Sequence, residues 1–311
     1  MDDETIETLH AAGVTDGLPV VPPTRARVER ALAAAGRRAD EIVATVAPAH
    51  GVATVEKIAI NAVMAGCRPE YLPVVIAGVE ALCDDAFDLV GISGTTDAVA
   101  PLFIVNGPIR KTLDINSGVG ALGPGWRANA SIGRALRLVW LNLGGARPGV
   151  ISMSTFGNPA RYTACFAEHE EASPWMPLHV ERGYPADTST VAAFAGEPLQ
   201  IVADTQSRSA EDVLSTIAHS LAVIGSHRIR ALGDTLILFS PEHASTIGAD
   251  GWSKPRVREF LWQKTAGKFR SPDNLIPLVV GGTAGRFTAL IPGWPFPDAP
   301  SALVLKRIEP V

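Results

Sequence analysis

Cysteine is scarce in this chain. Its 311 residues include three cysteines, Cys67, Cys83 and Cys165, which are widely spaced and form no CxxC pair. An odd number of isolated cysteines excludes a disulfide framework and a zinc ribbon. Reduced thiols are typical of the cytoplasm, so we expect a cytoplasmic protein.

Long apolar runs and basic runs are missing as well. The best apolar candidate, residues 72–83, is shorter than the roughly 18 residues that span a bilayer, and it contains Glu80. The opening residues MDDETIETLH are acidic and polar, unlike a signal peptide. The 27 Lys and Arg residues are outnumbered by 32 Asp and Glu residues, which gives a net charge of −5. We therefore expect no membrane and no nucleic acid as a partner.

The familiar catalytic motifs are absent. The chain contains no GxSxG, no Walker A and no HExxH sequence, so no motif specifies a reaction. The metal and the cofactor are left undetermined.

What the chain does contain is the pattern of an α/β fold. Hydrophobic residues make up 47% and charged residues 19%, which is typical of a soluble protein with a sizeable core. Apolar periodicity and capping residues predict alternating helices and strands that form mixed sheets. We expect two lobes, residues 1–150 and 151–311, that face each other across a cleft. The predicted helices are residues 2–12, 24–35, 54–65, 69–83, 131–143 and 209–224, one that starts at Ser240, and one that runs from Ser253 to Thr265. The predicted strands are residues 42–47, 88–92, 101–105, 190–194, 199–203, 235–239, 276–280, 287–291 and 302–306.

Residues 117–145 organise the rest of the chain. A glycine-rich loop leads into a helix that is apolar on nearly every side and therefore buried. Arg134 and Arg137 share one edge of this helix. A glycine loop and arginines suit a small anion, so we expect Arg127 and Arg134 to hold an oxyanion that Asn129 orients. The alternative is a tight turn before a core helix, with arginines that reach solvent or pair with carboxylates.

Other polar residues lie in apolar surroundings. Lys57 and Asn61 fall on one stripe of a predicted helix, which faces either a polar site or solvent. In a site, Lys57 would stabilise developing negative charge or act as a base. Asp16 lies in the proline-rich loop 15–24, where it either lines the site or forms a turn. Asn106 lies at the end of a predicted strand, where α/β proteins place ligands.

A histidine and a carboxylate form the predicted acid–base pair. His179 and Glu181 lie in a proline-rich stretch that the pattern predicts to be extended, which would put both side chains on one face. Such a pair is the smallest general acid–base unit, half of a metal site, or a structural contact. A metal-dependent enzyme that uses His50, His179 and a carboxylate is a further hypothesis.

Several stretches together resemble a bacterial protein family without an assigned activity, whose members are encoded beside small proteins with a UGSC motif. The stretches are residues 15–24, 53–75, 104–108, 122–145, 172–183 and 241–262. The resemblance implies a soluble metabolic protein that forms one half of a two-component system with a thiol or selenol partner. The family pattern has Asn where this chain has Trp126, an Asn-Asp-His run near Asp204, and a His near Arg286. These departures imply a changed site or substrate.

Two hypotheses for function follow. The first is an enzyme, or the substrate-binding subunit of one, that acts on a small anionic metabolite as a lyase, a hydrolase or a thiol-coupled reductase. The second is a non-catalytic partner subunit that docks a UGSC-type protein. The buried arginines and proline-rich loops also suit a subunit interface, so we expect an oligomer.

Overall fold

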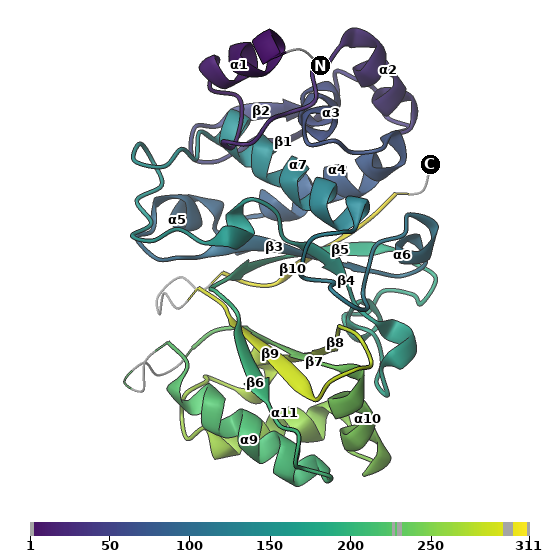
Figure 1. Ribbon diagram of the computed structural model, residues 1–311, viewed down its shortest axis with the longest axis vertical. Coiled ribbons are helices and arrows are strands. Elements are labelled where there is room, and N and C mark those ends of the chain that lie inside the picture. The colour runs from purple at the N-terminus through teal and green to yellow at the C-terminus, as the bar shows by residue number, and fades with distance from the viewer. Residues whose placement is uncertain (1–2, 226–227, 229–231, 295–300, 310–311) are drawn as a thin grey trace.

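The protein has four layers, two of helices outside and two of sheet inside. The computed structural model describes residues 3–225, 228, 232–294 and 301–309. Figure 1 shows the order from top to bottom: helices, a four-stranded sheet, a second four-stranded sheet, and helices again. The predicted α/β class is therefore confirmed.

The first sheet has the strand order β10-β5-β3-β4. Its central strand β3 (Ala100–Asn106) runs parallel to β4 (Cys165–Ala167) and antiparallel to β5 (Thr190–Gly196), and β10 (Val304–Arg307) lies antiparallel to β5. Every residue of β3 and β5 is buried. Continuous burial is expected of strands that are covered on both faces.

The second sheet repeats this arrangement in the order β6-β9-β7-β8. Strand β7 (Thr235–Phe239) runs parallel to β8 (Leu275–Val279) and antiparallel to β9 (Phe287–Pro292), and β6 (Gln200–Ala203) lies antiparallel to β9. The repeat lies in the topology, since the sequence shows no internal repeat.

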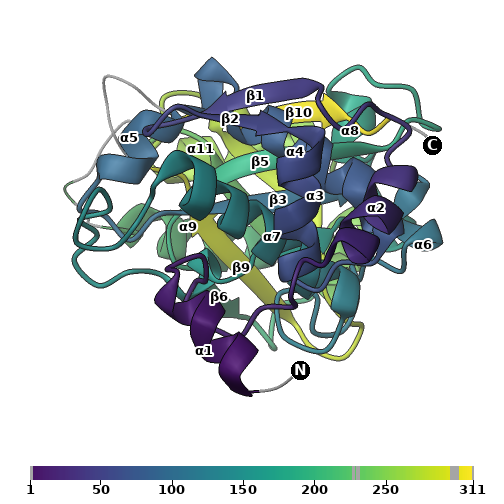
Figure 2. The ribbon, with the colours of Figure 1, turned by 90° about the horizontal axis from the view of Figure 1, so that it is seen from above.

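Helices cover the outer face of each sheet. Figure 2 shows the upper helices lying over the first sheet. The main helices of this layer are α3 (Val55–Met64), α4 (Leu72–Leu82) and α7 (Arg127–Gly144), and those of the lower layer are α9 (Ala210–Val223), α10 (Pro241–Ala249) and α11 (Lys254–Lys264). The smaller elements are α1 (Asp3–Ala11), α2 (Arg25–Ala33), the β1–β2 hairpin (Ile42–Val46 and Gly51–Thr54), α5 (Leu89–Gly94), α6 (Ile109–Thr112) and α8 (Leu178–Glu181).

The two sheets pack directly on each other. Along β3, Leu102 and Ile104 join the core between the sheets, where Leu238 meets them, whereas Phe103 and Val105 join the core under the upper helices. This alternation is the two-residue period of a strand. Buried side chains fill the space between the sheets, so the predicted cleft does not lie there.

The strand pairing also cuts across the predicted lobes. Strands β4, β5 and β10 all follow residue 150, yet they belong to the same sheet as β3. A boundary between residues 1–150 and 151–311 would therefore divide the first sheet.

Two local predictions were wrong. Residues 88–92 were predicted as a strand, but residues 89–92 lie in helix α5 and Asp88 caps it, its carboxylate accepting from the Gly91 N–H at 3.0 Å. The central helix begins at Arg127 rather than Ser131, whose hydroxyl donates to the Arg127 carbonyl at 2.7 Å instead of capping the helix. Short polar side chains serve both purposes, which makes helix starts hard to place from sequence.

The core between the sheets should be sensitive to cavities. Ile104 is fully buried there, so we expect Ile104→Ala to lower the free energy of unfolding by about 2–5 kcal/mol. Val90→Ala, at a side chain that is 57% exposed, is the matched control and should change it far less. Urea denaturation of both variants measures the difference. Equal losses would contradict a filled interface between the sheets.

Candidate functional site

Arg134 and Asp16 lie together, but they bind each other. Arg134 Nε and Nη2 donate to the two carboxylate oxygens of Asp16 at 2.9 and 2.8 Å. Nη2 also donates to the carbonyls of Leu18 and Pro19 at 3.1 and 2.9 Å. Arg134 therefore anchors the 15–24 loop to α7, which is the carboxylate-paired alternative rather than a free anion site.

Asn61 and Lys57 both have hydrogen-bond partners within the protein. The Asn61 side-chain oxygen accepts from Asn142 Nδ2 at 2.8 Å, and the same nitrogen donates to the Val14 carbonyl at 3.0 Å. Lys57 is exposed, and its Nζ donates to the Val52 carbonyl at 3.0 Å. The lysine lies on a solvated edge of α3, and Asn61 ties α3 to α7.

Arg127 and Asn129 fix backbone at the start of α7. Arg127 donates through Nε and Nη2 to the Gly66 carbonyl, just beyond the end of α3, at 3.1 and 2.9 Å. Asn129 accepts from the Asn116 N–H at 2.8 Å and donates to the carbonyls of Asn116 and Ala121 at 2.9 and 3.2 Å. Both side chains thus hold neighbouring loops in place.

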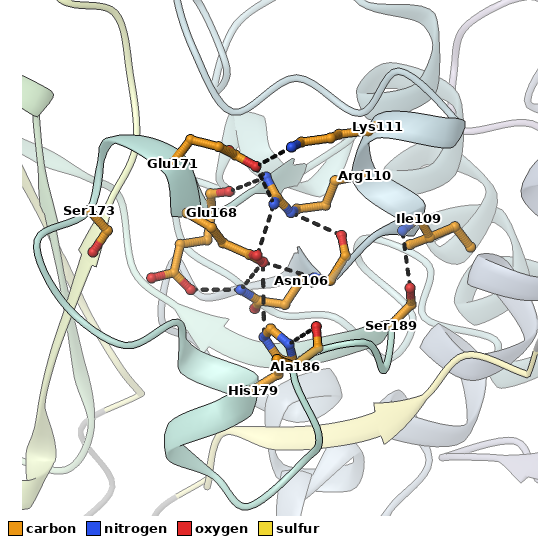
Figure 3. Close-up of polar contacts among 12 residues, drawn as sticks. Asn106, Ile109, Arg110, Lys111, Glu168, Glu171, Ser173, His179, Ala186 and Ser189 are labelled. Carbon is orange, nitrogen blue, oxygen red and sulfur yellow. Dashed lines mark hydrogen bonds and ion pairs between the residues drawn. The ribbon is translucent and has the colours of Figure 1, made fainter.

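Asn106 and His179 meet in a polar cluster at the carboxyl ends of β3 and β4 (Figure 3). Asn106 Nδ2 donates to Glu168 Oε2 at 2.6 Å and to Glu170 Oε1 at 3.0 Å. His179 Nδ1 lies 3.9 Å from Glu170 Oε1. The carboxylate nearest to this histidine is Glu170, not Glu181.

The predicted His179–Glu181 pair is wrong because the segment is helical. Both residues lie in the helical turn α8, where positions two apart point to nearly opposite sides. Glu181 instead binds Lys254 Nζ at 3.1 Å and Arg258 Nη2 at 2.5 Å.

Arg110 closes the cluster from the side of α6. Its guanidinium contacts Glu170 Oε2 at 2.8 Å and Glu171 Oε1 at 3.0 Å, and it donates to the carbonyls of Gly107 and Glu168 at 3.1 and 3.0 Å. Its Nη1 also reaches Glu171 Oε2 at 3.3 Å. Four of these contacts are hydrogen bonds, and the contact with Glu170 is an ion pair. Lys111 Nζ also lies 2.8 Å from Glu171 Oε1, so two cations face the carboxylates of Glu170 and Glu171.

Several buried atoms of the cluster have no hydrogen-bond partner among the described residues. They are Asn106 Oδ1, Glu168 Oε1, His179 Nδ1 and Thr190 Oγ1, and Thr190 lies opposite Asn106 in the β3–β5 pairing. Burial raises the pKa of the Glu168 carboxyl and lowers the pKa of His179. The cluster therefore favours a neutral carboxyl group beside a neutral imidazole.

The raised pKa of Glu168 predicts how stability depends on pH. Glu in the unfolded chain ionises near pH 4.3, whereas the folded carboxyl stays protonated to higher pH. The neutral Glu168 side chain therefore contributes fully to folding stability below the unfolded pKa, and this contribution is lost as pH rises through the folded pKa. Gln keeps an oxygen for Asn106 and for the Leu178 N–H, which donates to Glu168 at 2.9 Å. We expect Glu168→Gln to gain stability relative to wild type as pH rises from 4 to 8. Urea denaturation at several pH values, with the exposed Glu259→Gln in parallel, measures this gain, and a difference that does not vary with pH would contradict the buried neutral carboxyl.

A second group of residues was not predicted as a site. Arg137 of α7 and Arg161 both lie over the ring of Trp140, with Cζ 4.8 and 5.6 Å from its centroid. Arg137 Nη1 and Arg161 Nη2 are buried and have no hydrogen-bond partner among the described residues. Burial lowers the pKa of both guanidinium groups, that of Arg137 to about 10, and their mutual repulsion adds to the effect on Arg137.

These two arginines line a pocket of about 660 Å³, here called the arginine pocket, with Asp16 and the 148–162 loop. The two carboxylates nearby leave both guanidinium groups without an ion pair among the described residues. Asp16 is held by Arg134, and Asp97 raises the pKa of Arg161 by its charge without forming a salt bridge. The pocket therefore presents uncompensated positive charge.

The arginine pocket and the polar cluster lie at opposite ends of β3. Arg161 Nε donates to the Val99 carbonyl at 2.8 Å, just before β3, whereas Asn106 is its last residue. Seven residues of strand span about 20 Å. The arginine pocket and His179 therefore do not share one cleft. The helical spacing placed Arg137 on the same edge as Arg134, but no sequence pattern indicated Arg161 as a site residue.

Metal and thiol sites are not found in the described part of the chain. No group of three or more His, Cys, Asp or Glu side chains there is arranged to hold a metal ion. Burial raises the pKa of Cys67 and Cys83 to about 12 and that of Cys165 still further, so all three thiols resist ionisation.

Comparison with known proteins gives no match. No protein-family model, no curated protein and no solved structure matches the chain. Within the described residues, no helix has both the length and the hydropathy needed to cross a bilayer.

Proposed function

We propose that this chain is an enzyme, or the substrate-binding subunit of one, that binds a small anionic metabolite in the arginine pocket. The observation that carries the proposal is the pair of buried, unpaired donors, Arg137 Nη1 and Arg161 Nη2. A buried donor without a partner costs about 1–3 kcal/mol, and more when it is charged. A carboxylate or phosphate group supplies several charged acceptor oxygens for such donors.

The size and the walls of the pocket fit a metabolite. Its volume of about 660 Å³ lies within the usual range for small-molecule sites. Ser152 fixes one arginine, because its hydroxyl accepts from Arg161 Nη1 at 2.5 Å. Phe156 and Tyr162 add apolar surface beside the charged groups. A compact acid with an apolar portion suits these walls.

The lining favours a binding subunit over a complete enzyme. Apart from the two arginines, the titratable side chains among the described lining residues are Asp16, which is paired with Arg134, and Tyr162. The acid–base candidates Glu170 and His179 lie at the other end of β3. We therefore propose that a partner protein supplies the acid–base or thiol group for the reaction, whether this is that of a lyase, a hydrolase or a thiol-coupled reductase.

A second candidate function is a non-catalytic subunit that docks a UGSC-type protein. The observation that favours it is the apolar rim of the arginine pocket, where Phe156 is 94% and Met153 56% exposed. Contiguous exposed apolar residues often mark interaction sites. A partner seated on this rim would bring its thiol or selenol next to the bound anion, so this proposal and the first are compatible.

Anion binding should raise the melting temperature. Succinate, acetate, phosphate and sulfate are compared with ammonium and a neutral amide at constant ionic strength, because a ligand that binds the folded state stabilises it. We expect at least one anion to give a saturable shift, and Arg137→Met to weaken its binding about ten- to hundredfold through the loss of a charged hydrogen bond. Arg137→Lys, which keeps the charge but not the guanidinium fork, should lie between.

The control for this experiment is Arg38→Gln. Arg38 is 81% exposed and binds Asp40, so its substitution should leave the shift unchanged. Melting without ligand shows whether each variant folds. A shift that survives in folded Arg137→Met and Arg161→Met variants would reject the arginine pocket as the anion site.

Partner docking should depend on the apolar rim. We expect the chain to co-elute with a UGSC-type protein in size-exclusion chromatography, and Phe156→Asp to abolish this by placing a charge in the contact. Phe156 is almost fully exposed, so the substitution should not affect folding. Val90→Asp, at an exposed position on α5, is the control. If Phe156→Asp and wild type co-elute equally with the partner, the rim is not the contact.

A further inference from the structure

A second pocket lies in the lower half of the molecule, between residues 174–181 and the turn from α10 to α11. Trp175, Met176 and Trp252 form its apolar wall, and Glu181 and Lys254 form its charged part. Its volume is about 520 Å³. We call it the tryptophan pocket. It shares no lining residue with the arginine pocket.

The aromatic wall is held in place by its own contacts. Trp175 Nε1 donates to the Trp252 carbonyl at 2.8 Å, and its ring lies 5.6 Å from that of Phe239. Trp252 packs edge-on against Phe260 at 5.2 Å and carries the guanidinium of Arg256 3.9 Å from its ring centre. Because both indoles are fixed, a ligand need not order them on binding.

Glu181 offers one negative charge to the two cations that bind it. Glu181 binds both Lys254 and Arg258, one on each carboxylate oxygen. Burial acts to raise the pKa of Glu181, but the two cations together outweigh burial and lower it. Lys254 is 4% exposed and uses one of its three N–H donors on Glu181. The next carboxyl group, Glu168, lies within electrostatic range of Lys254, but burial favours its neutral form.

We propose that the tryptophan pocket is a binding site for a monocarboxylate that carries an aromatic or bulky apolar group. The carboxylate would take the free donors of Lys254 and supply a second negative charge to the two cations. The apolar group would lie against Trp175, Met176 and Trp252. An amine would add to the positive charge, and acetate would leave the aromatic wall uncovered, so neither fits both halves of the site.

The fluorescence of the full-length chain tests this proposal. Because Trp175 and Trp252 line the pocket, phenylacetate should change the emission saturably, and benzylamine and acetate should bind at least tenfold more weakly. Trp175→Phe should remove a large part of the signal change, which places the ligand beside this indole.

The substitutions that test the charge are made at Met176, which is 56% exposed and so tolerates replacement. Met176→Glu should weaken phenylacetate binding at least tenfold by repulsion, whereas the matched Met176→Lys should not weaken it. Lys254→Met should abolish binding, with its melting temperature as a check on folding. Equal binding of benzylamine and phenylacetate, or equal affinity of the two Met176 variants, would overturn the proposal.

This test of the tryptophan pocket does not depend on whether the arginine pocket binds an anion. Arg137→Met should leave phenylacetate binding unchanged, because the two pockets share no residue. If Arg137→Met abolished the fluorescence change, the ligand would be in the arginine pocket, and the tryptophan pocket would be rejected as its site.

Discussion

The face-to-face packing of the two sheets is the constraint on which the rest of the structure depends. Each sheet has one face on the other sheet and one face under helices, so β3, β5, β7 and β8 are buried along their whole length. Buried strands with both faces covered leave little room for polar side chains. Polar groups are therefore displaced to the ends of the strands, and the polar cluster and the arginine pocket lie at the two ends of β3. The positions of both candidate sites thus follow from the layer architecture.

Local patterns were enough to predict most elements of the fold. The helices that follow Ser240 and Ser253 were predicted from their capping residues, and each of these side chains accepts from a backbone N–H in the first turn. What sequence could not predict was pairing over a long range. Strand β10 reaches back across the chain to β5, and the helical turn α8 forms inside a proline-rich stretch whose local pattern favoured an extended chain. Both outcomes depend on contacts with segments far away in the sequence, which periodicity does not report.

The repeated topology of the two sheets does not bring a repeated site. Thr190 pairs with the last residue of β3, and Thr288 pairs with the last residue of β7. The Thr288 hydroxyl contacts His243 Nδ1 at 2.8 Å, and His243 Nε2 contacts the Asp204 carbonyl at 3.1 Å, so the second sheet satisfies its buried threonine. The Thr190 hydroxyl has no partner among the described residues. The same strand order thus supports a closed structural network in one half and an open polar cluster in the other, since side chains rather than topology make a site.

Arg134 and Arg137 show why a site is harder to predict than a fold. They lie three residues apart on one edge of α7, in similar sequence, and either could have been the anion-binding residue. Asp16 reaches Arg134 from 118 residues away and neutralises it, whereas the charged group that acts most strongly on the pKa of Arg137 is another cation, Arg161. Whether an arginine is paired with a carboxylate or left without an ion pair is therefore decided by which remote side chain lies beside it. Such a contact exists only in the folded chain, so local sequence patterns do not reveal it.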